Sequence, residues 1–334
     1  MKKRFTASLV AASFLMAGTA LAADVTLKVA HGAPESNHMH KAWQKFEEIV
    51  EKRTNGDIEV EIYPAGQLGE GRELLEFVQM GEIDLNAEAV GVLSGWDDIF
   101  AATELPYTFA SREVARKVFL GEYGDWLAEK MEPIGLKSMG WFEIGIRQLT
   151  NSRGAVYTPD DVDGLKLRTM QVDAHITAWS KLGANPMPMA SGEVYSALQQ
   201  GVIDAQENPL SNIRSMRTHE VNKYISLTNH VYSAYTVVMN PAKFESLSPE
   251  QQTIVSDAVL EASEYQQSLI KAEEPELVDW FRAQGNEVNE LTPEQMALFQ
   301  GKIKELKPEF QKLVGEEAYG RLMDAVAKAE AELN

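Results

Sequence analysis

Hydrophobic and polar residues alternate in two short segments near the start of the chain, at 26–30 (TLKVA) and 58–63 (IEVEIY). Alternation of this kind predicts β-strands. Residues 40–53 carry apolar side chains at helical spacing, and a second helical pattern covers 70–80. A third strand is expected to start at 83–85. Strands that alternate with helices predict a parallel sheet with helices packed on its faces.

A weak internal repeat links two distant parts of the chain. Residues 74–85 read LLEFVQMGEIDL and residues 194–205 read VYSALQQGVIDA. Each helical pattern stops at a glycine, Gly81 or Gly201, and resumes as a strand through Ile-Asp. A glycine just past a helix end adopts the left-handed conformation that other residues resist. The repeat predicts two similar α/β lobes; the alternative is two unrelated turns that share common stop signals.

A long helix is predicted late in the chain. Ser248 and Gln251 form a capping-box pattern, and a helical pattern then runs from Pro249 to about Gln284, interrupted only by Pro275. A helix of about 35 residues is about 50 Å long. Because this exceeds the diameter of one lobe, we expect the helix to bridge both lobes.

The first 22 residues have the pattern of a secretory signal peptide. A basic head at 2–4 precedes an apolar stretch from Phe5 to about Ala17, and the motif at 20–22 (ALA) is one that signal peptidase accepts. The stretch is too short and too polar to span a membrane. A buried core helix is the alternative. We expect a soluble chain that is exported to the periplasm.

The composition excludes several classes of function. The 334 residues include 31 basic and 50 acidic ones, which gives a formal net charge of −19, and no cysteine. Nucleic-acid binding needs clustered lysine and arginine, so the charge argues against a nucleic-acid partner. Without cysteine the chain forms no disulfide, thiolate zinc site, iron–sulfur centre or cysteine nucleophile.

Candidate metal, nucleotide and catalytic motifs have the wrong spacing. His31, His38 and His40 are close in sequence, but His38 and His40 do not share one helix face. Residues 160–164 (DDVDG) resemble part of a calcium loop that lacks its final glutamate, and residues 69–71 (GEG) lack the third glycine of a dinucleotide motif. We expect no metal, no cofactor and no catalytic set, with one of these histidines facing a cleft.

Two arginines are candidates for binding an anion. Arg168 ends a predicted strand at 165–168, and ligands of parallel α/β sheets lie beyond the carboxyl ends of strands. Arg147 lies in 145–151 (GIRQLTN), where the chain would pass between the lobes. A guanidinium donates two parallel hydrogen bonds to a carboxylate and keeps its charge. The alternative is that one or both arginines form structural ion pairs with the many acidic residues.

Four segments resemble the substrate-binding proteins of tripartite ATP-independent periplasmic (TRAP) transporters, the DctP family. They are YPAGQLGEGRE (63–73), GIRQLTNS (145–152), GLKLR (164–168) and MPMASGEVYSALQQGVIDAQENP (187–209). The resemblance covers essentially the whole chain after the signal peptide. It implies a two-lobed α/β periplasmic binding protein that closes on a small organic anion and delivers it to the membrane subunits of a TRAP permease.

The resemblance and the element pattern together suggest how the chain divides. Each lobe is expected to be a mixed, mostly parallel sheet flanked by helices, and a long helix bridges the two. We expect the first lobe at 23–146 plus about 236–275, and the second at 147–235 plus about 276–334. Each lobe would therefore consist of two separate stretches of chain.

The resemblance also implies roles for single residues. Arg168 matches the arginine that pairs with the ligand carboxylate, and Arg147 matches a second arginine that often faces the ligand. Asn208 matches the asparagine that holds the carboxylate or its neighbour. Glu88 falls where an acidic residue commonly contacts ligand hydroxyl groups, and His31 falls in the first ligand-facing loop.

Other wall residues are expected from position alone. Trp141, Gln171 and Tyr232 are candidates, and each could equally pack in the core. The chain carries Ser191 where many relatives have a phenylalanine that stacks on the ligand, so no relative's particular ligand carries over. The helical tail could support a dimer, although we expect a monomer.

Two other functions remain open from the sequence. One is a periplasmic enzyme acting on a small acid, with Glu88 or His31 as general base. The other is a sensory protein that presents its loaded form to a membrane receptor. The ligand is also open, because a C4-dicarboxylate, a sugar acid or a hydroxy acid would each satisfy two arginines and an asparagine.

Overall fold

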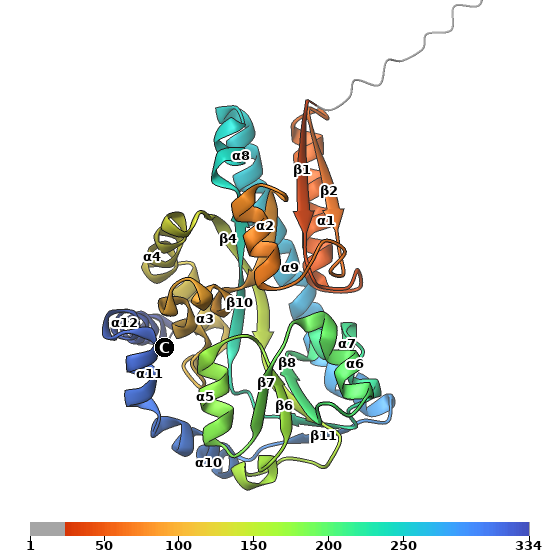
Figure 1. Cartoon of the computed structure of the whole chain (residues 1–334), viewed down its shortest axis with the longest axis vertical. Helices are drawn as coiled ribbons and strands as arrows, with labels where there is room; N and C mark the ends of the chain where they lie inside the picture. The colour runs from red at the N-terminus through yellow and green to blue at the C-terminus, as the bar shows by residue number, and fades with distance from the viewer. Residues whose placement is uncertain (1–23, 334) are drawn as a thin grey trace, which may run out of the picture.

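Two β-sheets form the framework of the structure, one in the upper and one in the lower part of Figure 1. The computed structural model describes residues 24–333, so the predicted signal peptide, residues 1–22, lies outside the described residues. The strands are β1 (Val25–Ala30), β2 (Ile58–Tyr63), β3 (Leu85–Ala89), β4 (Lys137–Ile146), β5 (Gln148–Asn151), β6 (Lys166–Thr169), β7 (Asn185–Pro188), β8 (Ala205–Asn208), β9 (Tyr224–Leu227), β10 (Tyr232–Met239) and β11 (Glu287–Glu290).

The two sheets share one arrangement at their parallel ends. The first sheet has the order β2-β1-β3-β10-β4, and the second has the order β11-β9-β5-β8-β6-β7. In each sheet the first strand of a parallel set lies between the second and the third, and an antiparallel strand follows the third. The prediction of two α/β lobes with mixed sheets is confirmed.

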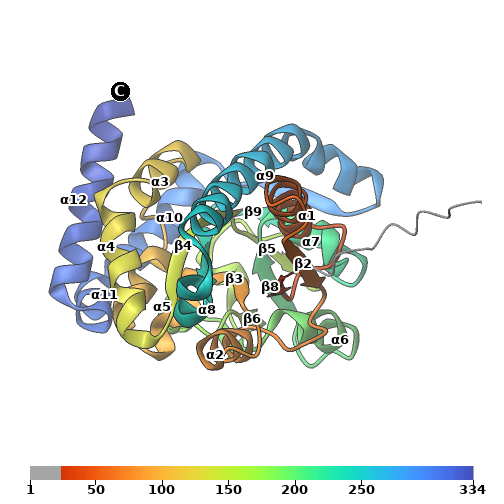
Figure 2. The ribbon, with the colours of Figure 1, turned by 90° about the horizontal axis from the view of Figure 1, so that it is seen from above.

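Helices cover both sheets (Figures 1 and 2). The α-helices are α1 (His38–Arg53), α2 (Arg72–Met80), α3 (Arg112–Phe119), α4 (Glu122–Met131), α5 (Asp173–Lys181), α6 (Val194–Gln199), α7 (Leu210–Ser215), α8 (Pro241–Ser246), α9 (Pro249–Ala283), α10 (Pro293–Lys304), α11 (Lys307–Val314) and α12 (Glu316–Leu333). Short 3-10 helices include η1 (Val90–Gly95), η2 (Asp98–Glu104) and η5 (Ser191–Glu193). No helix within residues 24–333 is both long enough and apolar enough to cross a lipid bilayer.

The internal repeat corresponds to the same local structure in both sheets. Helix α2 ends at Met80, directly before Gly81, and α6 ends at Gln199, two residues before Gly201. Both glycines are left-handed, with φ of 76° and 70°. Asp84 then donates its backbone N–H to the carbonyl of Lys28 and accepts the N–H of Lys28 on its carboxylate. Asp204 makes the same two bonds with Lys166. The Ile-Asp motif therefore fixes the third strand beside the first in both lobes.

Replacing either helix-ending glycine with alanine should destabilise the chain. A side chain in the left-handed region costs about 1–2 kcal/mol, so we expect Gly81→Ala and Gly201→Ala each to lower the free energy of unfolding by that amount. Gly301→Ala is the control, because Gly301 lies inside α10 with open space around it and should gain up to about 1 kcal/mol. Urea unfolding measures all three; equal effects at the three positions would contradict the assignment.

Helix α9 connects the two sheets, as predicted. Ser248 and Gln251 form the expected capping box, and the helix continues for 35 residues through Pro275. Figure 2 shows α9 running past α1, and α9 also contacts α7 and β11 of the second sheet. Just before Pro275, Glu273 pairs with Arg214 of α7 and Glu274 pairs with Arg112 of α3, a helix that packs on β4 of the first sheet.

The chain crosses between the sheets twice before α9, and α9 then makes a third crossing to β11. The first crossing, at Arg147, separates β4 from β5 and coincides with the expected boundary between lobes. The return crossing lies between Leu227 and Tyr232, because β10 pairs with β4 along its whole length and with β3 over 235–239. Helix α12, which was expected in the second lobe, packs against α3 and α4. The division into lobes stays a prediction, and these contacts argue for assigning more of the chain to the first lobe.

Candidate functional site

A cavity of about 250 Å³ lies between the two sheets. Much of its wall comes from segments at the carboxyl ends of parallel strands, namely the loops after β1, β2 and β7 and the ends of β3, β6 and β8. This is where parallel α/β sheets place their ligands. Residues of β4, β10, α1 and α7 also line the cavity. Five of the eight residues expected from the sequence line the cavity: Glu88, Arg147, Arg168, Gln171 and Asn208.

Arg168 is a buried cation whose side-chain hydrogen bonds, among the described residues, go to a backbone carbonyl. Its side chain is 4% exposed, and Nε and Nη2 donate to the carbonyl of Met189 at 3.0 and 2.7 Å. No carboxylate among residues 24–333 lies within ion-pair distance of it. Burial and the neighbouring Arg147 lower the pKa of Arg168 to about 10, so the guanidinium keeps its charge at neutral pH. A buried charge of this kind is costly unless an opposite charge joins it.

Arg147 does form the structural ion pair that the sequence left open. It is 1% exposed, and its Nε and Nη2 pair with the carboxylate of Glu207, with Nη2 2.8 Å from Oε1. Nη2 also donates to the carbonyl of Glu207 at 2.6 Å. Burial alone would raise the pKa of Glu207, but Arg147 and His230 hold it well below its usual range. Arg147 therefore lines the cavity with its charge already neutralised.

A buried polar network extends from this pair beneath the cavity. His230 Nε2 lies 2.9 Å from Glu207 Oε2, and His175 Nδ1 lies 3.9 Å from Glu207 Oε1. His175 Nε2 is in turn 3.1 Å from Glu104, which accepts a hydrogen bond from Ser233 at 2.6 Å. The network joins η2 and β10 of the first sheet to α5 and β8 of the second. It holds together the region where the chain crosses between the sheets.

Two carboxylates also belong to the cavity wall. Glu88, at the end of β3, is half-buried, and its Oε1 accepts the N–H of Ala89 at 3.0 Å. Burial raises the pKa of Glu88 to about 7. Glu70 reaches across from the loop after β2, and its Oε2 accepts the N–H of Gly192 in the opposite lobe at 2.5 Å. A Cβ at Gly192 would lie too close to Glu70 Oε1 for a non-bonded contact, so a side chain there would displace this carboxylate.

A chain of amides fixes Asn208 at the cavity wall. Asn208 Nδ2 donates to Gln206 at 2.7 Å, and its Oδ1 accepts from Asn212 at 3.4 Å. Asn212 Oδ1 accepts from Asn37, which also caps the start of α1. Because Asn37 and Asn212 belong to opposite lobes, these bonds hold the lobes together beside the cavity.

Three expected residues lie outside the cavity wall. His31 is fully buried, with its Nε2 3.2 Å from His40 Nδ1, and burial lowers its pKa to about 3. Tyr232 packs among aromatic side chains, with its ring centre 5.8 Å from that of Phe109. Trp141 packs on Phe119, with ring centres 5.2 Å apart. Trp141 and Tyr232 therefore pack against other aromatic side chains, which was the alternative to a place in the cavity wall. His31 lies behind the loop that lines the cavity.

Several polar residues that line the cavity were not identified from the sequence, among them Asn37, Glu70, Asn212 and Tyr235. All of β10 is buried, so alternation along this strand does not show which side chains face the cavity. An irregular register between Ser233 and Ala234 further separates Tyr235 from Tyr232. Asn37 carried a usable signal, because asparagine is a preferred residue at a helix start.

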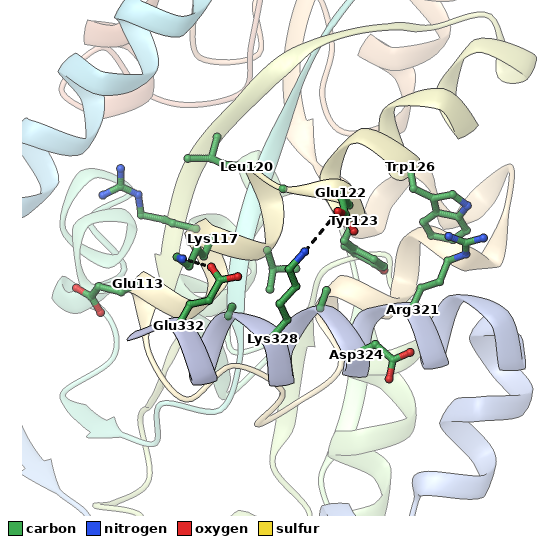
Figure 3. Close-up of a pocket in the computed structure, with 15 residues that line it drawn as sticks. Glu113, Lys117, Leu120, Glu122, Tyr123, Trp126, Arg321, Asp324, Lys328 and Glu332 are labelled. Carbon is green, nitrogen blue, oxygen red and sulfur yellow. Dashed lines mark hydrogen bonds and ion pairs between the residues drawn. The ribbon is translucent and has the colours of Figure 1, made fainter. Parts of the chain in front are cut away.

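A larger hollow of about 750 Å³ lies elsewhere, between α3, α4 and α12 (Figure 3). Ion pairs of Lys117 with Glu332 and of Lys328 with Glu122 join α12 to the other two helices across it. Its walls carry as many acidic as basic side chains, and none of the eight residues expected from the sequence lines it. The smaller cavity between the sheets is therefore the candidate site.

The sequence matches the family model described as bacterial extracellular solute-binding protein, family 7 (DctP), over residues 29–313. It is 36% identical over 264 residues to the 2,3-diketo-L-gulonate-binding periplasmic protein YiaO of Escherichia coli strain K12, which covers 79% of this chain and 80% of that protein. It is 31% identical to the C4-dicarboxylate-binding periplasmic protein DctP of Rhodobacter capsulatus, over 98% of this chain and 100% of that protein.

A solved structure agrees with these relatives. The sugar acid binding protein DctPAm of Advenella mimigardefordensis, in complex with galactonate, has a TM-score of 0.89 to this chain at 27% identity, covering 91% of this chain and 98% of that one. Both the family model and the fold therefore extend over nearly all of the described residues. The chain belongs to the DctP family, the solute-binding proteins of TRAP transporters.

Proposed function

We propose that this chain is the extracytoplasmic receptor of a TRAP transporter and binds a small organic acid through an ion pair between Arg168 and the ligand carboxylate. One observation carries the proposal: Arg168 is a buried, charged guanidinium that faces a cavity between the lobes without a carboxylate partner among the described residues. A ligand carboxylate would supply the missing charge. The loaded receptor would then deliver its ligand to the membrane permease.

The rest of the cavity suits such a ligand. Asn208 and Gln171 offer amide groups near Arg168, while Glu88 offers an acceptor for ligand hydroxyl groups. The ligands named for relatives, 2,3-diketo-L-gulonate, C4-dicarboxylates and galactonate, are all small carboxylic acids. Closure would exclude water from the ion pair, so the closed state would bind the acid more tightly than the open state and would be favoured by it.

A ligand screen tests this function. Purified mature chain is heated with members of an organic-acid library and, as matched controls, with the corresponding neutral amides. Ligands that bind only the folded state raise the melting temperature, so at least one acid should raise it. Calorimetry should then measure a dissociation constant in the micromolar range for that acid, which corresponds to a binding free energy of about −8 kcal/mol. If no acid is bound, or if the amide binds as well as its acid, the proposal is wrong.

The enzymatic alternative loses one of its two bases, because His31 does not line the cavity. Glu88 remains in the wall, but the relatives are described as solute-binding proteins. We therefore propose binding without turnover, and recovery of the acid unchanged after long incubation is the expected result. Co-purification with a permease rather than with a membrane sensor would separate transport from the sensory alternative.

We further propose that residues 1–22 direct the chain to the periplasm and that it acts as a monomer. The relatives cited above are named as periplasmic proteins. The cavity is completed by the two lobes of one chain, so a monomer is sufficient for binding. Sedimentation of the mature chain, with and without ligand, tests the oligomeric state.

A further inference from the structure

The two arginines of the cavity wall are not equally available to a ligand. Arg147 and Arg168 are the basic residues among those that line it, and Arg147 is neutralised by Glu207. One cation, Arg168, therefore remains for a ligand. The same wall carries two carboxylates, Glu70 and Glu88.

We propose that the ligand carries a single carboxylate together with hydroxyl groups, and that Glu88, supported by Glu70, excludes acids with a carboxylate at both ends. This inference rests on the proposed function, because it assumes that Arg168 holds the first carboxylate. It adds a choice between ligand classes that the named relatives leave open, since they include binders of sugar acids and of C4-dicarboxylates.

Hydrogen bonding at Glu88 favours a hydroxyl group. One carboxylate oxygen, Oε1, accepts the N–H of Ala89, and no hydrogen bond within residues 24–333 involves the other. An ionised carboxylate only accepts hydrogen bonds, and a ligand hydroxyl can donate one. A second ligand carboxylate has no proton to donate at neutral pH. It would also face like charge without a second free cation to compensate.

Glu70 is the second carboxylate of the cavity wall. Its carboxylate bonds to the backbone N–H of Gly192, so it is held in place as the lobes meet. The negative charge of Glu70 also raises the pKa of Glu88, whereas Arg168 and the N–H of Ala89 lower it. Among the described residues, the cavity wall therefore carries one cation without a carboxylate partner and two carboxylates, a set of charges that suits a hydroxylated monocarboxylate better than a dicarboxylate.

The selectivity should depend on pH. The other charged or titratable groups that line the cavity with Glu88 are Arg147, Arg168, Glu70, Tyr195 and Tyr235. The pKa of Glu88 is raised to about 7, so Glu88 is charged above that pH and neutral below it. Affinity for a dicarboxylate should therefore increase as pH falls from about 8 to about 5.5, while both ligand carboxylates remain ionised.

Matched ligand pairs test the proposal. Galactonate and galactarate, gluconate and glucarate, and erythronate and meso-tartrate differ only in whether the far end is a hydroxymethyl group or a carboxylate. For any pair in which the monocarboxylate binds, calorimetry at about pH 8 should show at least about tenfold weaker affinity for the dicarboxylate. The reason is that juxtaposed like charges are strongly unfavourable.

Variants connect the selectivity to the residue. Glu88→Gln keeps the size and removes the charge, so it should reduce the preference to less than about threefold and abolish its pH dependence. Glu76→Gln, on the exposed face of α2 and away from the cavity, changes the net charge equally and should retain the preference. Melting curves of the ligand-free variants confirm that each is folded.

Receptor function and ligand selectivity are contradicted by different outcomes. If the dicarboxylate of a pair binds as tightly as its monocarboxylate at about pH 8, or if Glu88→Gln leaves the preference unchanged, the inference is overturned while receptor function stands. If Arg168 plays no part in the binding of either acid, the proposed function fails first.

Discussion

Replacing Arg168 with glutamine should weaken binding of the organic acid by at least about 100-fold. Each charge-assisted hydrogen bond contributes about 1.5–3 kcal/mol, and truncating one partner of a buried charge pair costs about 2–5 kcal/mol. Arg168 is the only arginine of the cavity wall that is not already paired with an acid of the described chain. Calorimetry on wild type and variant measures the ratio directly.

The ligand-free stability of the same variant separates binding from folding. Arg168 lacks a carboxylate partner among the described residues, so Arg168→Gln should leave the melting temperature of the ligand-free chain unchanged or raise it. Arg168→Lys keeps the charge but loses the planar fork and should recover only part of the affinity. Arg153→Gln, which removes an exposed arginine paired with Asp204, is the control and should bind normally. Affinity within about threefold of wild type in Arg168→Gln would contradict the assignment.

Replacing Glu207 with glutamine should have the largest effect on stability. Glu207 is fully buried and is the carboxylate that neutralises Arg147. Removing one partner of a buried ion pair leaves the other charge uncompensated, at a cost of about 3–5 kcal/mol. Urea unfolding near neutral pH should show this loss. Glu305→Gln, which breaks an exposed pair with Lys181, should change the free energy of unfolding by less than about 1 kcal/mol.

The stability difference between wild type and Glu207→Gln should depend on pH, and its direction follows from the pKa shift of Glu207. Arg147 and His230 hold the pKa of Glu207 in the folded chain below its usual value. Its stabilising contribution is therefore present above the ordinary glutamate pKa of about 4.3 and is lost as pH falls through the folded-state pKa. The gap between wild type and Glu207→Gln should be constant near neutral pH and should narrow below about pH 4. A gap that widens in acid would contradict this account.

Local patterns were enough to predict much of the fold. The strands at 26–30 and 58–63, the capping box before α9 and the two helix-ending glycines all follow from short-range rules, and the structure confirms each of them. The repeat of helix, glycine and strand depends on hydrogen bonds within one βαβ unit. Because its causes are local, it can be read from a single sequence.

The candidate site could be predicted only in part. Arg168 lies at the end of a strand, which places it at the sheet edge whatever surrounds it. The partner of Arg147, in contrast, is Glu207, which is 60 residues away in sequence and is brought close only by strand pairing. Tyr232 lies in β10, which is buried along its whole length, and Trp141 lies half-buried in β4. Position along these strands therefore did not separate wall from core.

The most direct measurement is a crystal structure of the mature chain with its acid bound. The account predicts a ligand carboxylate within hydrogen-bonding distance, about 3 Å, of the Arg168 guanidinium, in the cavity between the sheets. A carboxylate held elsewhere, with the guanidinium still bonded only to the carbonyl of Met189, would contradict it.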